Sequence, residues 1–207
     1  MNPQYDRIKR FLDKGRKAYI FDLDGTLADG THRLDKLPTE NLHLTESWVE
    51  FNRLSQHDTP IKATIQVMNN LMNSNDCIII LTGRSDDVER ETIKWLADND
   101  CEYDFLVMRS SADNRKDTVI KEEFLRCIGL ERIIAAWDDS PKVIEHFRSL
   151  GITTYQVCDY GDKLHAGLGS HGVDKLEECD HNWIKMSALG CDDYEFCDKC
   201  GRSEGIK

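Results

Sequence analysis

The chain has 207 residues and a mass of 23.9 kDa, enough for one α/β domain with a small appendage. A hydrophobic content of 40 % with only 4 prolines and 13 glycines is typical of a globular protein and excludes a fibrous or wholly disordered chain. The 38 acidic and 27 basic residues give a net charge of −11, which disfavours extended non-specific binding to nucleic acid. No apolar run reaches membrane-spanning length and the first residues lack the apolar core of a signal peptide, so we expect a cytoplasmic protein that does not contact a membrane.

Short β-rich runs alternate with segments of helical periodicity along most of the chain. This alternation predicts an α/β fold with a Rossmann-like, doubly wound parallel sheet. In such a sheet the carboxyl ends of the strands share one edge, where ligands bind. The predicted strands are 18–22, 77–82, 104–108, 132–138 and 153–157.

One segment interrupts the alternation between the first two predicted strands. It carries an apolar set around Trp48 and Phe51, which predicts a small helical cap over the edge of the sheet, with an ordinary surface excursion as the alternative. Four glycines without apolar periodicity near residue 165 predict a linker. The expected organisation is a domain over 1–160 with its cap at about 30–60, a linker over 161–175 and a tail over 176–207.

Two carboxylates, Asp22 and Asp24, leave the first predicted strand at a glycine turn in the run FDLDGTL. Carboxylates so close together repel each other unless a cation offsets their charge. Carboxylate oxygen is the ligand that Mg²⁺ prefers, so this turn predicts a magnesium site.

Further polar residues follow the other strands. Thr82, Gly83 and Arg84 end the second strand, and a hydroxyl, a guanidinium and backbone N–H groups suit a phosphate oxygen. Lys116 begins the helix after the third strand, and Asp138 with Asp139 ends the fourth. Each feature alone is weak, because helix caps and turns use the same residue types; their order along the strands carries the inference.

Strand–DxDGT, strand–TGR, a lysine at a helix start and strand–DD resemble the four motifs of the haloacid dehalogenase (HAD) superfamily of phosphohydrolases. The resemblance covers about residues 17–162. It implies that Asp22 is a nucleophile that forms an aspartyl-phosphate and that Asp24 is the general acid and base, protonated at the start. It also implies that Thr82 and Lys116 bind phosphate, and it gives the magnesium ligands as Asp22, Asp24, Asp138 and Asp139.

The runs KAYIFDLDGTLA, RKDTVIKEEF and AWDDSPKVIEHFRSLGI look like the 3′-phosphatase domains of bacteriophage polynucleotide kinase/phosphatases. This resemblance implies hydrolysis of 3′-phosphates on nucleic-acid ends, in the host cell if a phage encodes the chain. By the same resemblance Arg84, and Arg33 within the cap, contact the substrate. No G-x-x-x-x-G-K-[ST] run occurs, so no kinase activity is expected. The alternatives are a phosphatase of free (deoxy)nucleoside monophosphates, which the acidic charge favours, and an inactive binding module.

The last thirty residues contain a second candidate metal site. C-x-H and C-x-x-C-G pairs separated by a short loop have zinc-ligand spacing, and four protein ligands would make Zn²⁺ structural rather than catalytic. With Trp183 after the first pair, the pattern resembles small zinc-ribbon tails. Cys191 is an alternative to the histidine, and surface thiols without a metal are the other interpretation. The predicted ligands are Cys179, His181, Cys197 and Cys200.

Overall fold

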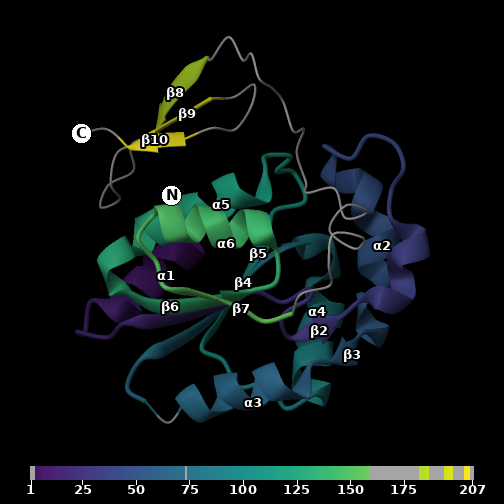
Figure 1. Ribbon diagram of the computed structural model, residues 1–207, viewed down its shortest axis with the longest axis horizontal. Helices are drawn as coiled ribbons and strands as arrows, with labels where there is room; N and C mark the ends of the chain where they lie inside the picture. Colours follow the sequence, from purple (N-terminus) through teal and green to yellow (C-terminus); the bar gives the residue numbers. More distant parts are fainter. Residues whose placement is uncertain (1–2, 73, 159–181, 187–193, 198–202, 206–207) are drawn as a thin grey trace.

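The computed structural model describes residues 3–72, 74–158, 182–186, 194–197 and 203–205. Its centre is a parallel five-stranded sheet with the strand order β5-β4-β1-β6-β7 (Figure 1). All five strands predicted from the sequence are confirmed, and the strand that leads to Asp22 is central. The strands are β1 (Ala18–Phe21), β4 (Cys77–Ser85), β5 (Phe105–Arg109), β6 (Ile133–Asp138) and β7 (Thr154–Gln156).

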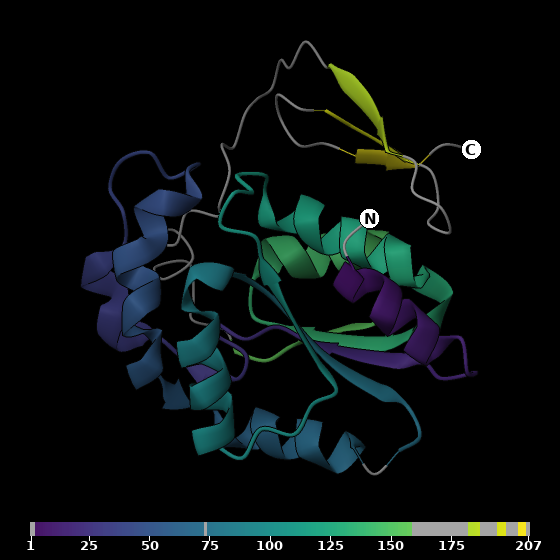
Figure 2. The ribbon, with the colours of Figure 1, turned by 180° about the vertical axis from the view of Figure 1, so that it is seen from behind.

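Helices cover the two faces of this sheet in separate layers (Figure 1, Figure 2). Neighbouring residues of a strand point to opposite faces, so Ile20 packs in the core with Phe124 while Phe21 packs in the core with Trp95. Burial on both faces explains why the strands read as continuous apolar runs. One layer holds α1 (Pro3–Leu12), α5 (Asp117–Ile128) and α6 (Pro141–Ser149), and the other holds α3 (Lys62–Leu71) and α4 (Glu89–Asp98).

The first helix, α1, was not predicted from the sequence. Its Ile8 and Leu12 are fully buried against the α5 side of the sheet, and Tyr5 stacks edge-to-face on Phe124 with ring centroids 5.0 Å apart. The apolar residues recur every three or four positions, but many charged residues between them dilute that pattern. Among the described helices, none has the length and apolar composition needed to cross a membrane.

The insertion between β1 and α3 is mostly helical, as predicted. Trp48 and Phe51 form its apolar centre, with ring centroids 5.9 Å apart. A two-residue antiparallel ladder that the sequence did not indicate closes its base, joining β2 (Ala28–Asp29) to β3 (Thr59–Pro60). Between these strands lie the 3₁₀ helices η1 (Thr31–Lys36), η2 (Thr45–Trp48) and η3 (Leu54–His57), and the α-helix α2 (Val49–Arg53).

The described part of the tail forms a separate antiparallel sheet with the order β10-β9-β8. Its strands are β8 (Trp183–Met186), β9 (Tyr194–Cys197) and β10 (Ser203–Gly205). Cys197 ends β9 and is buried. The other predicted zinc ligands and the predicted linker lie outside the described residues, so the domain boundaries in this region stay predictions; those residues are Cys179, His181, Cys191, Cys200 and 161–175.

Candidate active site

Three carboxylates meet at the carboxyl edge of the sheet. Asp22 follows β1, Asp138 ends β6 and Asp139 comes next, and one oxygen atom from each lies within 4.8 Å of the other two. All three residues are buried, with relative exposures of 6 %, 1 % and 7 %. A compact set of hard oxygen donors fits a small divalent cation such as Mg²⁺. Among the residues that the structure describes, these three form the cluster that could hold a metal ion.

The residues just before these carboxylates align the ends of β1 and β6. Phe21 on β1 pairs with Trp137 on β6, and their rings stack almost parallel with centroids 4.5 Å apart. The backbone N–H of Asp22 donates to the carbonyl oxygen of Trp137 at 2.9 Å. The stacked rings and the ladder bond therefore keep Asp22 and Asp138 in adjacent positions on neighbouring strands.

The turn after β1 requires glycine. Gly25 has a φ of +79°, which side chains with a Cβ rarely adopt, and a Cβ there would overlap the carboxylate of Asp139. Its N–H donates to the carbonyl oxygen of Ala28 at 2.8 Å, which closes the turn. The glycine of the DxDG run thus allows β1 to turn close beside the third carboxylate.

A buried lysine provides the positive charge of this cluster. The Nζ atom of Lys121, on α5, lies 2.8 Å from Oδ1 of Asp22, 3.0 Å from Oδ2 of Asp138 and 3.1 Å from Oδ2 of Asp117. The sequence analysis chose Lys116, which is the cap residue before α5 and is partly exposed, and phosphate binding by Lys116 stays a prediction. Lys121 lies one turn further along, on the face of α5 that packs against the sheet. Its position three residues before the core residue Phe124 is the signal that could have identified it.

Burial and mutual repulsion shift the pKa values of these groups. Burial, together with Asp138 and Asp139, raises the pKa of Asp22 well above its usual value despite the opposing effect of Lys121. Burial and the charge of Asp138 raise the pKa of Asp139 to about 7. Burial alone would lower the pKa of Lys121, but Asp117, Asp138 and Asp22 outweigh it and raise that pKa. The cluster therefore has more negative charge than Lys121 offsets, as a cation-binding site requires.

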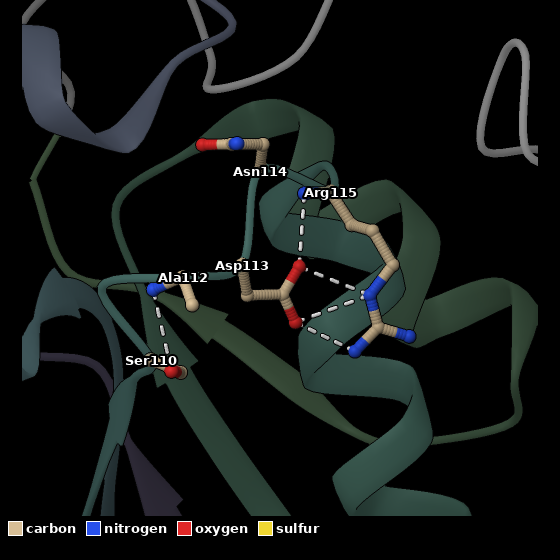
Figure 3. A pocket seen from close by; sticks show the side chains of 5 residues that line it. All are labelled: Ser110, Ala112, Asp113, Asn114 and Arg115. Atoms are coloured by element: carbon tan, nitrogen blue, oxygen red, sulfur yellow. Dashed lines mark hydrogen bonds and ion pairs between the residues drawn. The ribbon is translucent and has the colours of Figure 1, made fainter.

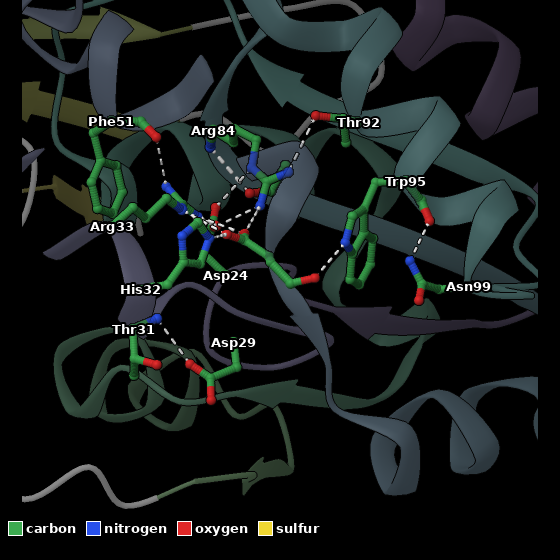
Figure 4. Close-up of polar contacts among 12 residues, drawn as sticks. Asp24, Asp29, Thr31, His32, Arg33, Phe51, Arg84, Thr92, Trp95 and Asn99 are labelled. Atoms are coloured by element: carbon green, nitrogen blue, oxygen red, sulfur yellow. Dashed lines mark hydrogen bonds and ion pairs between the residues drawn. The ribbon is translucent and has the colours of Figure 1, made fainter. Parts of the chain in front are cut away.

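The carboxylate of Asp24 contacts two arginines, Arg33 and Arg84 (Figure 4). Its Oδ1 atom accepts hydrogen bonds from Nη2 of Arg33 at 2.5 Å and from Nη2 of Arg84 at 2.6 Å. Nε of Arg84 lies 3.2 Å from the other oxygen atom. Both guanidiniums are buried, whereas the side chain of Asp24 is 35 % exposed. Asp24 therefore has a face that a ligand could reach.

The geometry bears on two expectations for Asp24. Its carboxylate is not among the three that converge, and magnesium binding by Asp24 stays a prediction. The resemblance also implied that Asp24 starts out protonated. Burial acts in that direction, but Arg84 and Arg33 hold the pKa of Asp24 well below its usual value. Without a bound substrate, Asp24 is a carboxylate.

A second acid, Asp58, contacts the same two arginines as Asp24. Its buried carboxylate accepts from Nε of Arg33 at 2.8 Å and from Nη2 of Arg84 at 3.1 Å. The guanidinium of Arg33 also lies over the ring of Phe51, 3.9 Å from its centroid. Arg33 and Arg84 were predicted to bind substrate. In the structure their guanidiniums contact the carboxylates of Asp24 and Asp58, and substrate binding by the two arginines stays a prediction. The sequence analysis missed Asp58, which stands in no motif.

The remaining predicted residues, Thr82 and Gly83, lie near the end of β4. Thr82 is buried, and its hydroxyl oxygen accepts from the N–H of Arg84 at 3.1 Å, which leaves the hydroxyl hydrogen to donate elsewhere. Nε of Arg109 donates to the carbonyl oxygen of Gly83 at 3.0 Å. A Cβ at Gly83 would overlap the Asp117 carboxylate. Phosphate binding by Thr82 and Gly83 stays a prediction.

A shallow pocket of about 570 Å³ lies beside the loop between β5 and α5 (Figure 3). Asp113 and Asn114 line it together with Ser110, Ala112 and Arg115. The same loop anchors the insertion, because the N–H of Thr45 donates to Oδ1 of Asn114 and its hydroxyl donates to the carbonyl oxygen of Asp113, both at 2.7 Å. The insertion is thus fastened to the sheet edge on the side of β5.

Comparison with known families gives a match over most of the chain. Residues 16–162 match the model of the polynucleotide kinase PNKP phosphatase domain. The chain is also 34 % identical over 157 residues to a protein of Autographa californica nuclear polyhedrosis virus named as a bifunctional polynucleotide kinase/RNA ligase. That match covers 72 % of this chain and 20 % of the viral protein, so the chain spans about a fifth of this relative's length.

Solved structures are similar over the same region. A chain of the Pnkp1/Rnl/Hen1 RNA repair complex is 26 % identical, with a TM-score of 0.54, and the match covers 70 % of this chain and 43 % of that chain. A HAD phosphatase from Thermococcus onnurineus is 16 % identical, with a TM-score of 0.51 and coverage of 70 % and 88 %. The second likeness supports the fold alone.

Replacing Lys121 by methionine is expected to lower kcat/KM for p-nitrophenyl phosphate by about 100-fold or more, because Asp22 and Asp138 lose a cation in a buried site. Lys116→Met is the matched control and is expected to stay near the wild-type value. Thermal melting of both variants establishes that they fold. A loss confined to Lys116→Met would return the assignment to Lys116.

Replacing Asp139 by asparagine is expected to stabilise the metal-free protein, because it removes one of three crowded negative charges. A gain of about 1 kcal/mol corresponds to a rise of roughly 2–4 °C in melting temperature. The measurement is thermal unfolding at pH 8 with EDTA and again with Mg²⁺. Mg²⁺ should stabilise the wild type more than the variant. A lower melting temperature for the variant in EDTA would contradict unrelieved repulsion at this position.

Proposed function

Because the chain belongs to the family of polynucleotide kinase phosphatase domains, within the HAD phosphatases, we propose that it removes 3′-phosphates from nucleic-acid ends. Membership of this family makes it a phosphoric monoester hydrolase. The proposal adds a magnesium requirement, an aspartyl-phosphate intermediate and the nucleic-acid substrate. The observation that carries it is the buried Asp22, which lies within both the carboxylate cluster and the reach of Lys121.

In the proposed reaction a carboxylate oxygen of Asp22 attacks phosphorus, and the bond between phosphorus and the ester oxygen breaks. The ester oxygen takes a proton from Asp24 and leaves as an alcohol. Water then attacks the aspartyl-phosphate, gives a proton to Asp24 and releases inorganic phosphate, which restores both carboxyl groups. Lys121, 2.8 Å from Asp22, is close enough to donate to an oxygen of the transferring group.

The donor set of Asp22, Asp138 and Asp139 fits Mg²⁺, which HAD phosphatases generally use. When bound, Mg²⁺ supplies positive charge that lets an anionic carboxylate approach an anionic phosphate. Asp138 also accepts from Lys121 and from the N–H of Ser140 at 2.9 Å, which orients its carboxylate. The residues around the cluster therefore hold its oxygen atoms in place.

The protonation state of Asp24 depends on the charges that surround it. In the substrate-free structure both guanidiniums favour its carboxylate form, the form that accepts a proton from water. A phosphate dianion beside Asp24 brings two negative charges, and like charges raise the pKa of a carboxyl group. In the proposed function, substrate binding therefore raises the pKa of Asp24, so that Asp24 can hold the proton that the ester oxygen needs.

Relatives support a nucleic-acid substrate rather than a small metabolite. The family is defined by polynucleotide kinase phosphatase domains, and the viral relative and the RNA repair complex are named for polynucleotide or RNA chemistry. The alternative substrates are free (deoxy)nucleoside monophosphates. The net charge of −11 favours them, because it opposes the approach of a long polyanion. An end-processing enzyme holds only the last few nucleotides, so local groups are enough.

The test compares phosphate release from a 3′-phosphorylated oligonucleotide with release from nucleoside 3′- and 5′-monophosphates, each with and without Mg²⁺. We expect a higher kcat/KM for the oligonucleotide and no turnover in EDTA. Asp22→Asn is the control and should abolish release, because an amide cannot attack phosphorus. Preference for the mononucleotides would favour the alternative function, and substantial turnover by Asp22→Asn would remove the proposed nucleophile.

For the tail we propose a structural zinc site, supported by the register of its sheet. Trp183 at the start of β8 pairs with Cys197 at the end of β9. In the sequence His181 stands two residues before Trp183, and Cys200 stands three residues after Cys197. An extended chain spans at most about 3.5 Å per residue, so His181 can lie no more than about 7 Å from Trp183, and Cys200 no more than about 11 Å from Cys197. Four such ligands would leave no position for a reactive water.

Protein purified without chelators is expected to contain one zinc ion per chain by elemental analysis, and Cys197→Ser should lose it. Cys191→Ser is the matched control and should retain the metal. If Cys191→Ser loses zinc while His181→Ala keeps it, the site uses four cysteines instead. Metal-free protein from such a purification would contradict the structural site altogether.

A further inference from the structure

Asp58 lies where the insertion returns to the sheet, directly before β3. Its side chain is fully buried, with an exposure of 0 %. Oδ1 accepts from Nε of Arg33 and Oδ2 from Nη2 of Arg33, both at 2.8 Å, which is a two-point contact with one guanidinium. Nε2 of His32 lies 3.0 Å from Oδ1. The backbone oxygen of Asp58 accepts from the indole N–H of Trp95, on α4, at 2.8 Å. Asp58 is therefore fixed both by its side chain and by its backbone.

The contacts form a closed ring of four charged side chains. Nη2 of Arg33 and Nη2 of Arg84 each bridge the two acids, because both contact Oδ1 of Asp24 and Oδ2 of Asp58. Two positive and two negative charges cancel within the ring, so its burial leaves no net charge. Arg84 is held further by Thr92, whose hydroxyl oxygen lies 3.3 Å from Nη1. The position of Asp24 thus depends on two guanidiniums that Asp58 aligns.

The two acids of the ring differ in what can reach them. The side chain of Asp24 is 35 % exposed at the carboxyl edge of the sheet, whereas that of Asp58 is enclosed by Arg33, Arg84 and the insertion. A substrate can contact Asp24 but not Asp58. Any effect of Asp58 on the reaction must therefore pass through the arginines.

We propose that Asp58 is a positioning residue for phosphoryl transfer, which holds Arg33 and Arg84 so that they direct Asp24 toward the leaving oxygen. This inference rests on the proposed function, because it takes Asp24 to be the group that protonates the leaving oxygen. Without the Asp58 carboxylate, the two guanidiniums lose one of the acceptors that hold them in place. The carboxylate of Asp24 is then no longer held in one orientation. Proton transfer from a misdirected acid slows most where the leaving group needs that proton.

The alternative is that Asp58 only fastens the base of the insertion to the sheet. The two roles differ in how the loss depends on the leaving group. p-Nitrophenolate departs without a proton, whereas an alkoxide such as that of glycerol 2-phosphate requires one. The first irreversible step is reported by kcat/KM, so the ratio of this constant between the two esters isolates protonation of the leaving group.

For Asp58→Asn we expect kcat/KM for glycerol 2-phosphate to fall by about 100-fold and that for p-nitrophenyl phosphate by less than about tenfold. Asp58→Glu, which keeps the charge but shifts the carboxylate, should give a smaller change of the same kind. If the asparagine variant does not fold, the glutamate variant provides the comparison. Equal losses on both esters would overturn the proposal and leave Asp58 a purely structural residue.

Glu122→Gln is the matched control. Glu122 is also buried and also holds two partners, Arg126 on the same helix at 2.7 Å and His146 on α6 at 2.8 Å, and neither contact involves Asp24 or its arginines. Its loss should lower the melting temperature without changing the ratio between the esters. A changed ratio in this variant would overturn the proposal, because general loosening would then explain the effect. If the wild type released no phosphate from 3′-phosphorylated oligonucleotides, the proposed substrate would be rejected. The comparison of kcat/KM between the two small esters would still test the role of Asp58.

Discussion

Burying carboxylates at the edge of a sheet costs several kcal/mol for each charge unless cations offset it. This constraint governs the site more than any other. Lys121 comes from α5, Arg84 from β4 and Arg33 from the insertion, and each of them contacts at least two acids. The elements around β1 are therefore tied to one another through charges that none of them could bury alone. Packing of the two apolar cores sets the strands side by side, and charge pairing then decides how their ends meet.

Asp22 and Asp24 stand only two residues apart, yet they belong to different electrostatic environments. Asp22 shares a lysine with Asp138 in a cluster that retains excess negative charge, which suits a metal ion and an attacking group. Asp24 lies in a ring in which the charges balance. The turn at Gly25 makes this separation possible, because its backbone conformation lets the chain reverse beside Asp139. One short motif thus supplies two acids whose environments push their pKa values in opposite directions.

Much of this arrangement could be predicted from the sequence. The five strands were found because strands buried on both faces read as apolar runs, and the order of the motifs indicated that Asp22 and Asp138 would share an edge. Lys121 was not singled out because Lys116 and Lys121 both lie near the start of one helix, and only packing shows which of them turns inward. Asp58 could not be found, since its partner Arg33 is 25 residues away and only the folded insertion joins them.

The base of the insertion also bears on how such a protein can change over generations. Arg33 and Asp58 stand at its two ends, and the described contacts between the insertion and Asp24 pass through Arg33 alone. The residues between these ends form a small helical body joined to the ring chiefly by the carbonyl oxygen of Phe51. Selection for a new substrate can therefore rebuild that body, in length and in shape, while the reaction chemistry beneath it is inherited unaltered.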